Sequence, residues 1–214
     1  MNLADIRREY TLAGLRRADL DANPIAQFQK WFEQATTAFA QKEIDVNAAT
    51  LATADKNGKP AARIILLKGL DERGFIFFTN YGSRKGRELA ENPSAALTFY
   101  WAELERQICA AGSVEKISRG ESENYFQSRP HGSRLAAWAS NQSDVVADRA
   151  ALEKKWNELA AKFPGDVPLP PNWGGFVLRP ARIEFWQGRP SRLHDRFCYT
   201  RLAEDSWKIE RFAP

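Results

Sequence analysis

The spacing of hydrophobic residues changes partway along this chain. Near the N-terminus, apolar side chains recur every three or four positions, which is the spacing of one face of an α-helix. Asn23 followed by Pro24 is a typical N-cap with proline at the first helical position, so we expect the helix to begin there. We predict that its apolar face covers an edge or a face of a sheet. That face consists of Ile25, Phe28, Trp31, Phe32 and Ala35.

From about residue 48 onward, the apolar residues form short runs separated by turn residues. Sequences such as DKNGK and DERG between the runs are typical of the tight turns that join antiparallel strands. We therefore predict strands over residues 47–54, 60–70, 75–80, 94–101, 106–117, 174–180, 181–186, 197–202 and 206–212.

Two further helices are predicted among these strands. Ser118 and Glu121 have the spacing of a capping box, which predicts a helix that runs through Tyr125. Residues 148–163 show the pattern of an amphipathic helix. The proline-rich residues 163–173 are expected to form an extended connector to the next strand.

Six or more antiparallel strands with a few flanking helices predict a mainly β fold of the α+β class. An open sheet of this size would leave long hydrophobic edges unpaired, so we expect a closed or split antiparallel β-barrel. The chain has 214 residues and no internal repeat. We therefore expect a single domain over residues 1–214, with residues 1–20 as a candidate flexible N-terminal arm.

The charge balance is mildly basic, because 31 Lys and Arg residues stand against 27 Asp and Glu residues. The basic residues cluster in short motifs and not in a stripe interleaved with aromatic residues, which favours a small anionic ligand over a nucleic acid. No apolar run approaches the roughly 20 residues of a membrane span, and the N-terminus lacks a signal-peptide core, so we expect a cytoplasmic protein without a membrane partner. Cys109 and Cys198 lack the spacing of metal ligands, so no metal is expected.

The densest chemistry lies in residues 186–196, WQGRPSRLHDR. Arginine binds phosphate or carboxylate, histidine exchanges a proton near neutral pH, and tryptophan covers a flat ring. This segment therefore predicts a site for a phosphorylated aromatic ligand. Arg192 and His194 would face the same side if the segment is extended. The alternative is a buried tryptophan with a peripheral cluster of ion pairs.

A second candidate anion site lies at the start of a predicted helix. Ser83 is the expected N-cap, and Arg84 and Lys85 stand in the first turn. Two cations at this position oppose the helix dipole unless a dianionic phosphate binds the free N–H groups there. The alternative is an ordinary pair of surface cations.

The motif RIILLK carries a basic residue at each end, Arg63 and Lys68. Odd spacing on a regular strand places these side chains on opposite faces, so we expect them to contact different ligands. The alternative is a pair of solvated cations that flank a core strand.

Tyr125, Arg129 and Ser133 recur every four residues and together have the chemistry of a phosphate clamp. Pro130 predicts that the helix runs into a loop there. His131 lies in the same loop and is expected to be exposed.

Several separated motifs together resemble one known family. They are RREY at residues 7–10, RIILLK, NYGSRKGREL, SRPHGSRLAAWASNQS, IEFWQGRPSRLHDR and the C-terminal WKIERFAP. In this order they resemble the pyridoxamine/pyridoxine 5′-phosphate oxidase family over nearly the whole chain. The resemblance implies an FMN-binding split barrel that forms a homodimer, with two flavins between the subunits. It also implies oxidation of pyridoxamine 5′-phosphate and pyridoxine 5′-phosphate to pyridoxal 5′-phosphate by hydride transfer to FMN, with O2 as acceptor and H2O2 as product.

The resemblance also implies roles for individual residues. Those matched to FMN binding are Arg63, Ile64, Ile65, Leu66, Leu67, Lys68, Phe78, Thr79, Arg84, Lys85, Gln107, Gln142, Ser143, Trp186 and Arg196. Those matched to substrate binding are Arg7, Arg8, Glu9, Tyr10, Lys68, Tyr125, Arg129, Ser133, Arg192, Leu193 and His194. Arg192 and His194 are matched to catalysis, and Trp186 and Arg196 to contacts made from the partner subunit. Asp45 has a looser match to an acidic residue near the substrate.

Two other functions are compatible with these residues. One is a related split-barrel flavin oxidase of the phenazine-assembly type, with another substrate. The clamp of Tyr125, Arg129 and Ser133 argues against it, because a ligand without phosphate has no use for a phosphate clamp. The other is a non-catalytic protein that binds FMN or pyridoxal phosphate, from which an enzyme would differ by producing peroxide when substrate is present.

Overall fold

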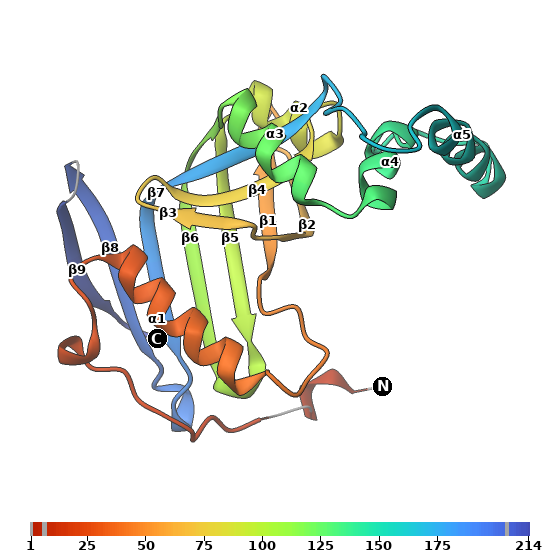
Figure 1. Cartoon of the computed structure of the whole chain (residues 1–214). Coiled ribbons are helices and arrows are strands. Elements are labelled where there is room, and N and C mark those ends of the chain that lie inside the picture. Colours follow the sequence, from red (N-terminus) through yellow and green to blue (C-terminus); the bar gives the residue numbers. More distant parts are fainter. Residues whose placement is uncertain (1, 6–7, 204–205) are drawn as a thin grey trace.

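The chain folds around one antiparallel sheet. The computed structural model describes residues 2–5, 8–203 and 206–214. The strand order is β2-β1-β5-β6-β7-β4-β3, with β8 paired to β7 and β9 to β8. This architecture confirms the predicted mainly β fold (Figure 1). Within the described residues the strands are β1 (Ala48–Ala54), β2 (Pro60–Leu66), β3 (Gly69–Asp71), β4 (Gly74–Asn80), β5 (Ser94–Trp101), β6 (Arg106–Lys116), β7 (Trp173–Gln187), β8 (Asp195–Ala203) and β9 (Ser206–Phe212).

The sheet forms a barrel that splits at β7. One edge of β7 pairs with β6 from Phe176 to Gln187. The other edge pairs with β4 in its first half and with β8 in its second half, so these two strands diverge from the same edge. At the ends of the strand order, only Leu67 and Lys68 separate β2 from β3. The two ends therefore meet, which is the arrangement of a split barrel.

β7 is one continuous strand, although the sequence pattern predicts two strands there. Its middle contains Pro180, which lacks the N–H that a regular ladder requires. The pairing register with β6 shifts between Ala111 and Gly112, and Gly112 is the residue opposite Pro180. A β-bulge at this position accommodates the proline without ending the strand.

The helices lie around the ends of the sheet. In Figure 1, α1 lies across the lower part of the sheet, α2 and α3 lie at its upper end, and α4 and α5 project beyond it. Capping confirms the predicted start of α1, because Asn23 Oδ1 accepts the Ile25 N–H at 2.8 Å. The capping box of Ser118 and Glu121 is also present. The helices are α1 (Pro24–Ala38), α2 (Arg84–Glu91), α3 (Arg119–Ser128), α4 (His131–Ala139) and α5 (Arg149–Lys162).

Aromatic side chains hold α1 against the barrel. The ring of Phe28 packs edge-to-face against Phe75 and Phe99, with centroids 4.9 and 5.0 Å apart. One turn further along, Trp31 packs against Phe185 of β7 at 5.2 Å. All five rings are buried. Because buried aromatic rings contribute large apolar areas, this cluster confirms that the apolar face of α1 covers the sheet.

The prediction of one strand over residues 60–70 is wrong. The backbone turns at Leu67 and Lys68, where the Leu67 N–H donates to the loop before β1 and the Lys68 N–H donates to Ile76 of β4. The chain changes its partner strand at this point. Lys68 therefore lies beyond the end of β2 and does not share a regular strand with Arg63.

The predicted loop after Arg129 is also wrong. The residue before a proline is driven to extended backbone, so α3 ends at Ser128. Pro130 then serves as the N-cap of a second helix, α4, which begins at His131. His131 is half-buried and not exposed, and its Nε2 lies 3.0 Å from the carbonyl oxygen of Phe163.

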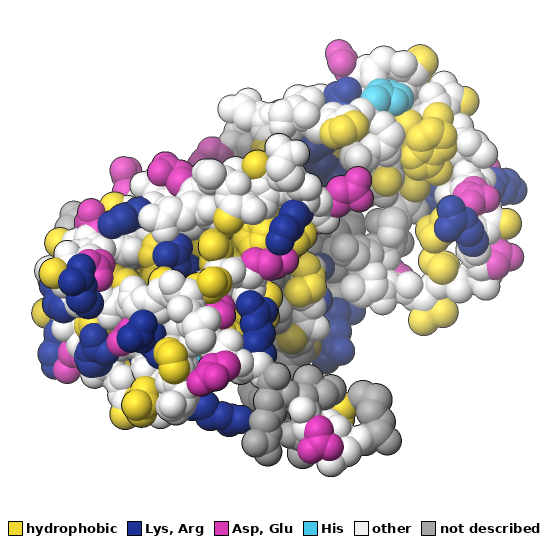
Figure 2. Space-filling view, turned by 90° about the horizontal axis from the view of Figure 1, so that it is seen from below, with side chains coloured by type: hydrophobic (Ala, Val, Ile, Leu, Met, Phe, Trp, Pro, Cys, Tyr) yellow, Lys and Arg dark blue, Asp and Glu magenta, His cyan; other side chains and the backbone are white. Residues whose placement is uncertain are grey.

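The surface seen in Figure 2 carries Lys and Arg side chains interspersed with Asp and Glu, while α4 and α5 stand apart from the body of the molecule. This face therefore lacks the basic track that follows a nucleic-acid backbone. In the part of the chain that the structure describes, no helix combines the length and the apolar character needed to cross a membrane.

Candidate functional site

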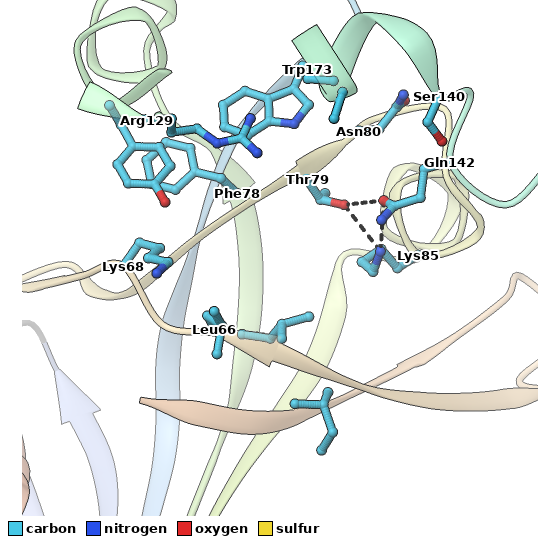
Figure 3. A pocket seen from close by; sticks show the side chains of 15 residues that line it. Leu66, Lys68, Phe78, Thr79, Asn80, Lys85, Arg129, Ser140, Gln142 and Trp173 are labelled. Carbon is cyan, nitrogen blue, oxygen red and sulfur yellow. Dashed lines mark hydrogen bonds between the residues drawn. The ribbon is translucent and has the colours of Figure 1, made fainter. Parts of the chain in front are cut away.

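A cavity of about 430 Å³ is lined by residues of β2, β4, β7, α2, α3 and α4, and we call it the first cavity. This volume is typical of small-ligand sites. Figure 3 shows Lys68, Phe78 and Arg129 toward one side, and Thr79, Gln142 and Lys85 toward the other. The cavity brings together many residues predicted to bind ligands: Ile64, Ile65, Leu66, Lys68, Phe78, Thr79, Lys85, Tyr125, Arg129 and Gln142.

One wall of the first cavity is a stack of aromatic rings beside an arginine. Phe78 stacks on Tyr125 with centroids 3.8 Å apart and on Trp173 at 5.6 Å. The guanidinium of Arg129 lies 4.8 Å from the centroid of Trp173. Its Nη1 is buried and has no hydrogen-bond partner among the described residues. Because an unpaired buried donor is costly, this atom marks a place for an anionic ligand.

Burial shifts the pKa values of two side chains in this wall. It lowers the pKa of the Arg129 guanidinium and raises the pKa of the Tyr125 hydroxyl. The tyrosine therefore remains a protonated hydrogen-bond donor at neutral pH. Together the two side chains offer donors to an anion at the edge of a flat apolar surface.

The opposite wall is the start of α2. Ser83 caps the helix as predicted, because its Oγ accepts a backbone N–H of the first turn at 3.3 Å. The Nζ of Lys85 lies 3.2 Å from Thr79 Oγ1 and 3.1 Å from Gln142 Oε1, which are neutral partners. Burial, and then the charge of Arg63, lowers the pKa of Lys85. A buried ammonium in these surroundings favours an additional anion.

Two arginines stand beside Lys85 and share one carboxylate. Arg63 Nη2 lies 3.0 Å from Glu88 Oε2, and Arg84 Nε lies 2.8 Å from Glu88 Oε1. The backbone N–H of Arg84 donates to Ser143 Oγ at 3.2 Å, which ties the segment before α5 to the start of α2. The predicted cations therefore converge on one helix terminus.

A second cavity of about 780 Å³ lies between the N-terminal arm and the turn after β7. The ring of Tyr10 packs edge-on against Trp186 at 5.5 Å and against His194 at 5.6 Å. Leu193 is 70% exposed and does not line the cavity, and Arg7 lies outside the described residues. The lining residues are Arg8, Glu9, Tyr10, Trp186, Arg189, Ser191, Arg192 and His194.

The segment before His194 is a turn, so the expectation of extended backbone is wrong. Residues Pro190–Arg192 form a tight turn that is not a regular helix, because Ser191 and Arg192 have φ angles of 54° and 62°. Left-handed backbone at residues other than glycine is strained and is maintained only by its surroundings. This turn, and not strand alternation, brings Arg192 and His194 to the same cavity.

Hydrogen bonding defines the state of His194. The backbone N–H of Arg189 donates to His194 Nδ1 at 3.0 Å, so the neutral ring carries its proton on Nε2. Burial, and then the charge of Arg192, lowers the pKa of His194. At neutral pH the ring is therefore uncharged and can donate a hydrogen bond from Nε2.

The two cavities lie near opposite ends of β7. Phe78 pairs with Gly175 near the start of the strand, whereas Trp186 pairs with Gln107 and Arg196 near its end. At about 3.3 Å per residue, the strand separates Gly175 from Trp186 by roughly 36 Å along its length. Within one chain, no small ligand contacts both sets of predicted residues.

Some residues of the two cavities were not predicted. Arg189 and Ser191 belong to the WQGRPSRLHDR segment, so its composition could have indicated them. The sequence carries no local signal for Trp173, which reaches Phe78 only through the pairing of β7 with β4. The unpredicted residues of the first cavity are Asn80, Ala136, Ala137, Ser140 and Trp173. Some predicted site residues that the structure describes line neither cavity. They are Arg63, Leu67, Arg84, Gln107, Ser133, Ser143, Leu193 and Arg196.

Two family profiles match the sequence. The profile described as "Pyridoxamine 5'-phosphate oxidase" matches residues 32–163. The profile described as "Pyridoxine 5'-phosphate oxidase C-terminal dimerisation region" matches residues 173–214. Two curated relatives named "Pyridoxine/pyridoxamine 5'-phosphate oxidase" are 54% identical over 213 residues, in Trichormus variabilis, and 57% identical over 214 residues, in Burkholderia mallei. The alignments cover 99% of this chain, and 98% and 99% of the relatives.

Solved structures show the same architecture. PhzG from Burkholderia lata, in complex with tetrahydrophenazine-1-carboxylic acid, is 32% identical with a TM-score of 0.89, and the match covers 97% of this chain and 100% of PhzG. An FMN-binding protein of Nostoc punctiforme, described as related to pyridoxamine 5'-phosphate oxidase, is 21% identical with a TM-score of 0.71. That match covers 87% of this chain and 97% of the other, and it supports the fold alone.

Proposed function

Because this chain belongs to the pyridoxamine 5′-phosphate oxidase family, we propose that it oxidises pyridoxamine 5′-phosphate and pyridoxine 5′-phosphate to pyridoxal 5′-phosphate. FMN is the cofactor, O2 is the electron acceptor and H2O2 is the second product. The observation that carries the substrate class is the unpaired, buried Nη1 of Arg129 beside the ring of Tyr125 and near Lys68. These groups suit a phosphate attached to a flat heterocycle.

The residues around α2 fit FMN. Lys85, Arg63 and Arg84 supply cations at a helix N-terminus, where a phosphate is favoured. On β2, Ile64 and Leu66 expose 65% and 37% of their surfaces, and both line the first cavity. These apolar side chains offer a contact surface for a flat ring system. When bound, FMN would supply the redox chemistry by taking a hydride from the substrate and passing electrons to O2.

The protein's own groups bind and orient the substrate. Lys68, Tyr125 and Arg129 hold its phosphate, with Ser133 on the next helix as a further donor. This binding is remote from the reacting carbon, so it contributes to catalysis by positioning. Arg192 and His194, from the second cavity of the other subunit, would lie over the pyridine ring, where the arginine stabilises charge that develops as hydride leaves. His194 donates a hydrogen bond from Nε2 to the substrate.

A homodimer completes this site. The roughly 36 Å of strand between the two ends of β7 prevents Trp186 and Arg196 from reaching an FMN bound at α2 of their own chain. In a two-fold dimer, the second cavity of one subunit closes on the first cavity of its partner. The match of residues 173–214 to a dimerisation region supports this arrangement. Each subunit contributes residues 1–214 as one domain, with residues 1–20 as its arm.

The proposal is tested by mixing the FMN-loaded protein with pyridoxine 5′-phosphate in the absence of oxygen and recording the flavin absorbance. We expect the flavin to bleach, and then to recover with formation of peroxide and pyridoxal 5′-phosphate when oxygen is admitted. A flavin that neither pyridoxine 5′-phosphate nor pyridoxamine 5′-phosphate bleaches would refute the activity.

An oxidase of the phenazine-assembly type is the second candidate, and the TM-score of 0.89 with PhzG favours it. The sequence identities favour the first candidate, since they are 54% and 57% with the pyridoxine/pyridoxamine 5'-phosphate oxidases and 32% with PhzG. Bleaching by a reduced phenazine carboxylate and not by either vitamin B6 phosphate would select the second candidate. A protein that binds FMN but is reduced by none of these compounds would be a carrier.

Gly188→Ala is expected to raise the KM for pyridoxine 5′-phosphate by about 3- to 30-fold without changing FMN affinity. A Cβ at Gly188 would lie 2.7–2.9 Å from atoms of Tyr10, so alanine displaces this ring from Trp186 and His194. Aromatic pairs contribute about 0.5–1.5 kcal/mol each. Steady-state kinetics measures the effect, and Gly165→Ala is the control because a Cβ there meets nothing within 4 Å. An unchanged KM would show that Tyr10 does not shape the substrate site.

A further inference from the structure

One buried carboxylate organises the cations at the start of α2. The side chain of Glu88 is only 7% exposed and accepts hydrogen bonds from three other side chains. Thr53 Oγ1 lies 2.5 Å from Oε2, and Arg63 Nη2 lies 3.0 Å from the same oxygen. Arg84 Nε lies 2.8 Å from Oε1. Both oxygens of one carboxylate are therefore engaged, each by a different guanidinium.

The cluster is complementary in charge to a phosphate monoester. Arg63, Arg84 and Lys85 are cationic and Glu88 is anionic, which leaves two net positive charges around one helix terminus. A phosphate monoester carries close to two negative charges at neutral pH. Without the carboxylate, three cations would repel one another in a partly buried site.

Hydrogen bonds keep this carboxylate ionised. Burial alone would raise the pKa of Glu88, but the hydrogen bonds from Thr53, Arg84 and Arg63 together outweigh burial and lower it. The carboxylate is therefore charged throughout the neutral range. Arg63 is additionally held through Nη1, which donates to Thr53 Oγ1. The position of the Arg63 guanidinium is thus set by β1 and α2 together before any ligand binds.

We propose that Glu88 is the positioning residue of the phosphate site, and that it holds Arg63 and Arg84 at the spacing that the FMN phosphate requires. This inference rests on the proposed function, because it takes FMN as the ligand. A guanidinium that is already immobilised loses less conformational entropy when it binds, so preorganisation raises affinity for the phosphate end of the cofactor. Glu88 itself, as an anion, does not bind the phosphate.

Glu88→Gln tests this role with little change in shape. A glutamine amide keeps one acceptor oxygen and replaces the other with an N–H donor, which faces a guanidinium and cannot bind it. One arginine therefore loses its anchor. We expect FMN affinity to fall about 10-fold, the effect of losing about one charge-assisted hydrogen bond. Affinity for riboflavin, which lacks the phosphate, should change less than about 2-fold because no phosphate contact is involved.

Quenching of flavin fluorescence measures both dissociation constants, and their ratio is a readout that general loosening of the fold would not change. Glu91→Gln is the matched control, since it removes the same charge from an exposed position on α2. Equal weakening of FMN and riboflavin, or tighter FMN binding, would overturn the proposal.

Thr53→Val is a second variant that tests the same role if Glu88→Gln does not fold. It removes the hydroxyl that holds both Glu88 and Arg63, and we expect a loss of FMN affinity of about 3-fold in the same direction, again without an effect on riboflavin. An unchanged ratio in this variant counts against the proposal. Failure of the wild-type protein to bind FMN would instead refute the proposed function, so the two failures are distinguishable.

Discussion

Arg192→Ala and His194→Ala are each expected to lower turnover of pyridoxine 5′-phosphate by about 100-fold or more, while the purified protein keeps its FMN. Removing one group that stabilises charge at a reacting centre typically costs this much. Both side chains line the second cavity and not the first, where the FMN phosphate is proposed to bind. Single-turnover bleaching of the flavin measures the chemical step, and the absorbance of the purified protein measures its flavin content.

The chain offers a control for the loss of an imidazole. His131 is the other of its two histidines; it contacts the carbonyl of Phe163 and lines neither cavity. His131→Ala should therefore retain turnover. Loss of flavin in both Arg192→Ala and His194→Ala would contradict the assignment of these residues to the substrate.

Arg84→Ala combined with Lys85→Ala is expected to weaken FMN binding by about 100-fold or more. Hydrogen bonds to charged groups contribute about 1.5–3 kcal/mol each, and this variant removes two cations from one helix terminus. Lys85 lies in the first cavity, where it contacts Thr79 and Gln142. Arg84 is the neighbouring residue and forms an ion pair with Glu88. Titration of the apoprotein with FMN measures the dissociation constant. The same titration with riboflavin measures the binding that does not involve the phosphate.

Lys154→Ala with Lys155→Ala is the matched control, because it removes two adjacent exposed cations from α5. Its FMN affinity should equal that of the wild type. Unchanged FMN affinity in the Arg84/Lys85 variant would refute a phosphate site at the start of α2.

Local interactions explain which structural predictions are confirmed. The caps at Asn23, Ser83 and Ser118 join a side chain to a backbone N–H two or three residues away, so their geometry follows from adjacent sequence. The strands of the meander are similarly marked by turn residues between apolar runs. In these segments, local preference and tertiary packing favour the same structure.

The errors occur where distant partners override local preference. Lys68 leaves the strand because its N–H pairs with Ile76 of β4. The turn at Ser191 and Arg192 adopts backbone that neither residue prefers, beside a His194 ring that the Arg189 N–H holds in place. A strained turn at a candidate functional cavity is the kind of feature that sequence patterns do not indicate.

By itself, the sequence determined the mainly β fold, the start of each capped helix and the chemical types of the candidate site residues, because these depend on residue type and on neighbours a few positions away. Only the tertiary structure decided that Trp173 joins the aromatic wall, that Glu88 links Arg63 to Arg84, and that β7 divides the predicted residues between two cavities. These features depend on strand register and on contacts between distant segments. Pairing of β7 with β4 and β8 in different halves sets the place of Trp173 and the division between the cavities. The Glu88 link forms where α2 meets β1 and β2, and no local pattern encodes either set of contacts.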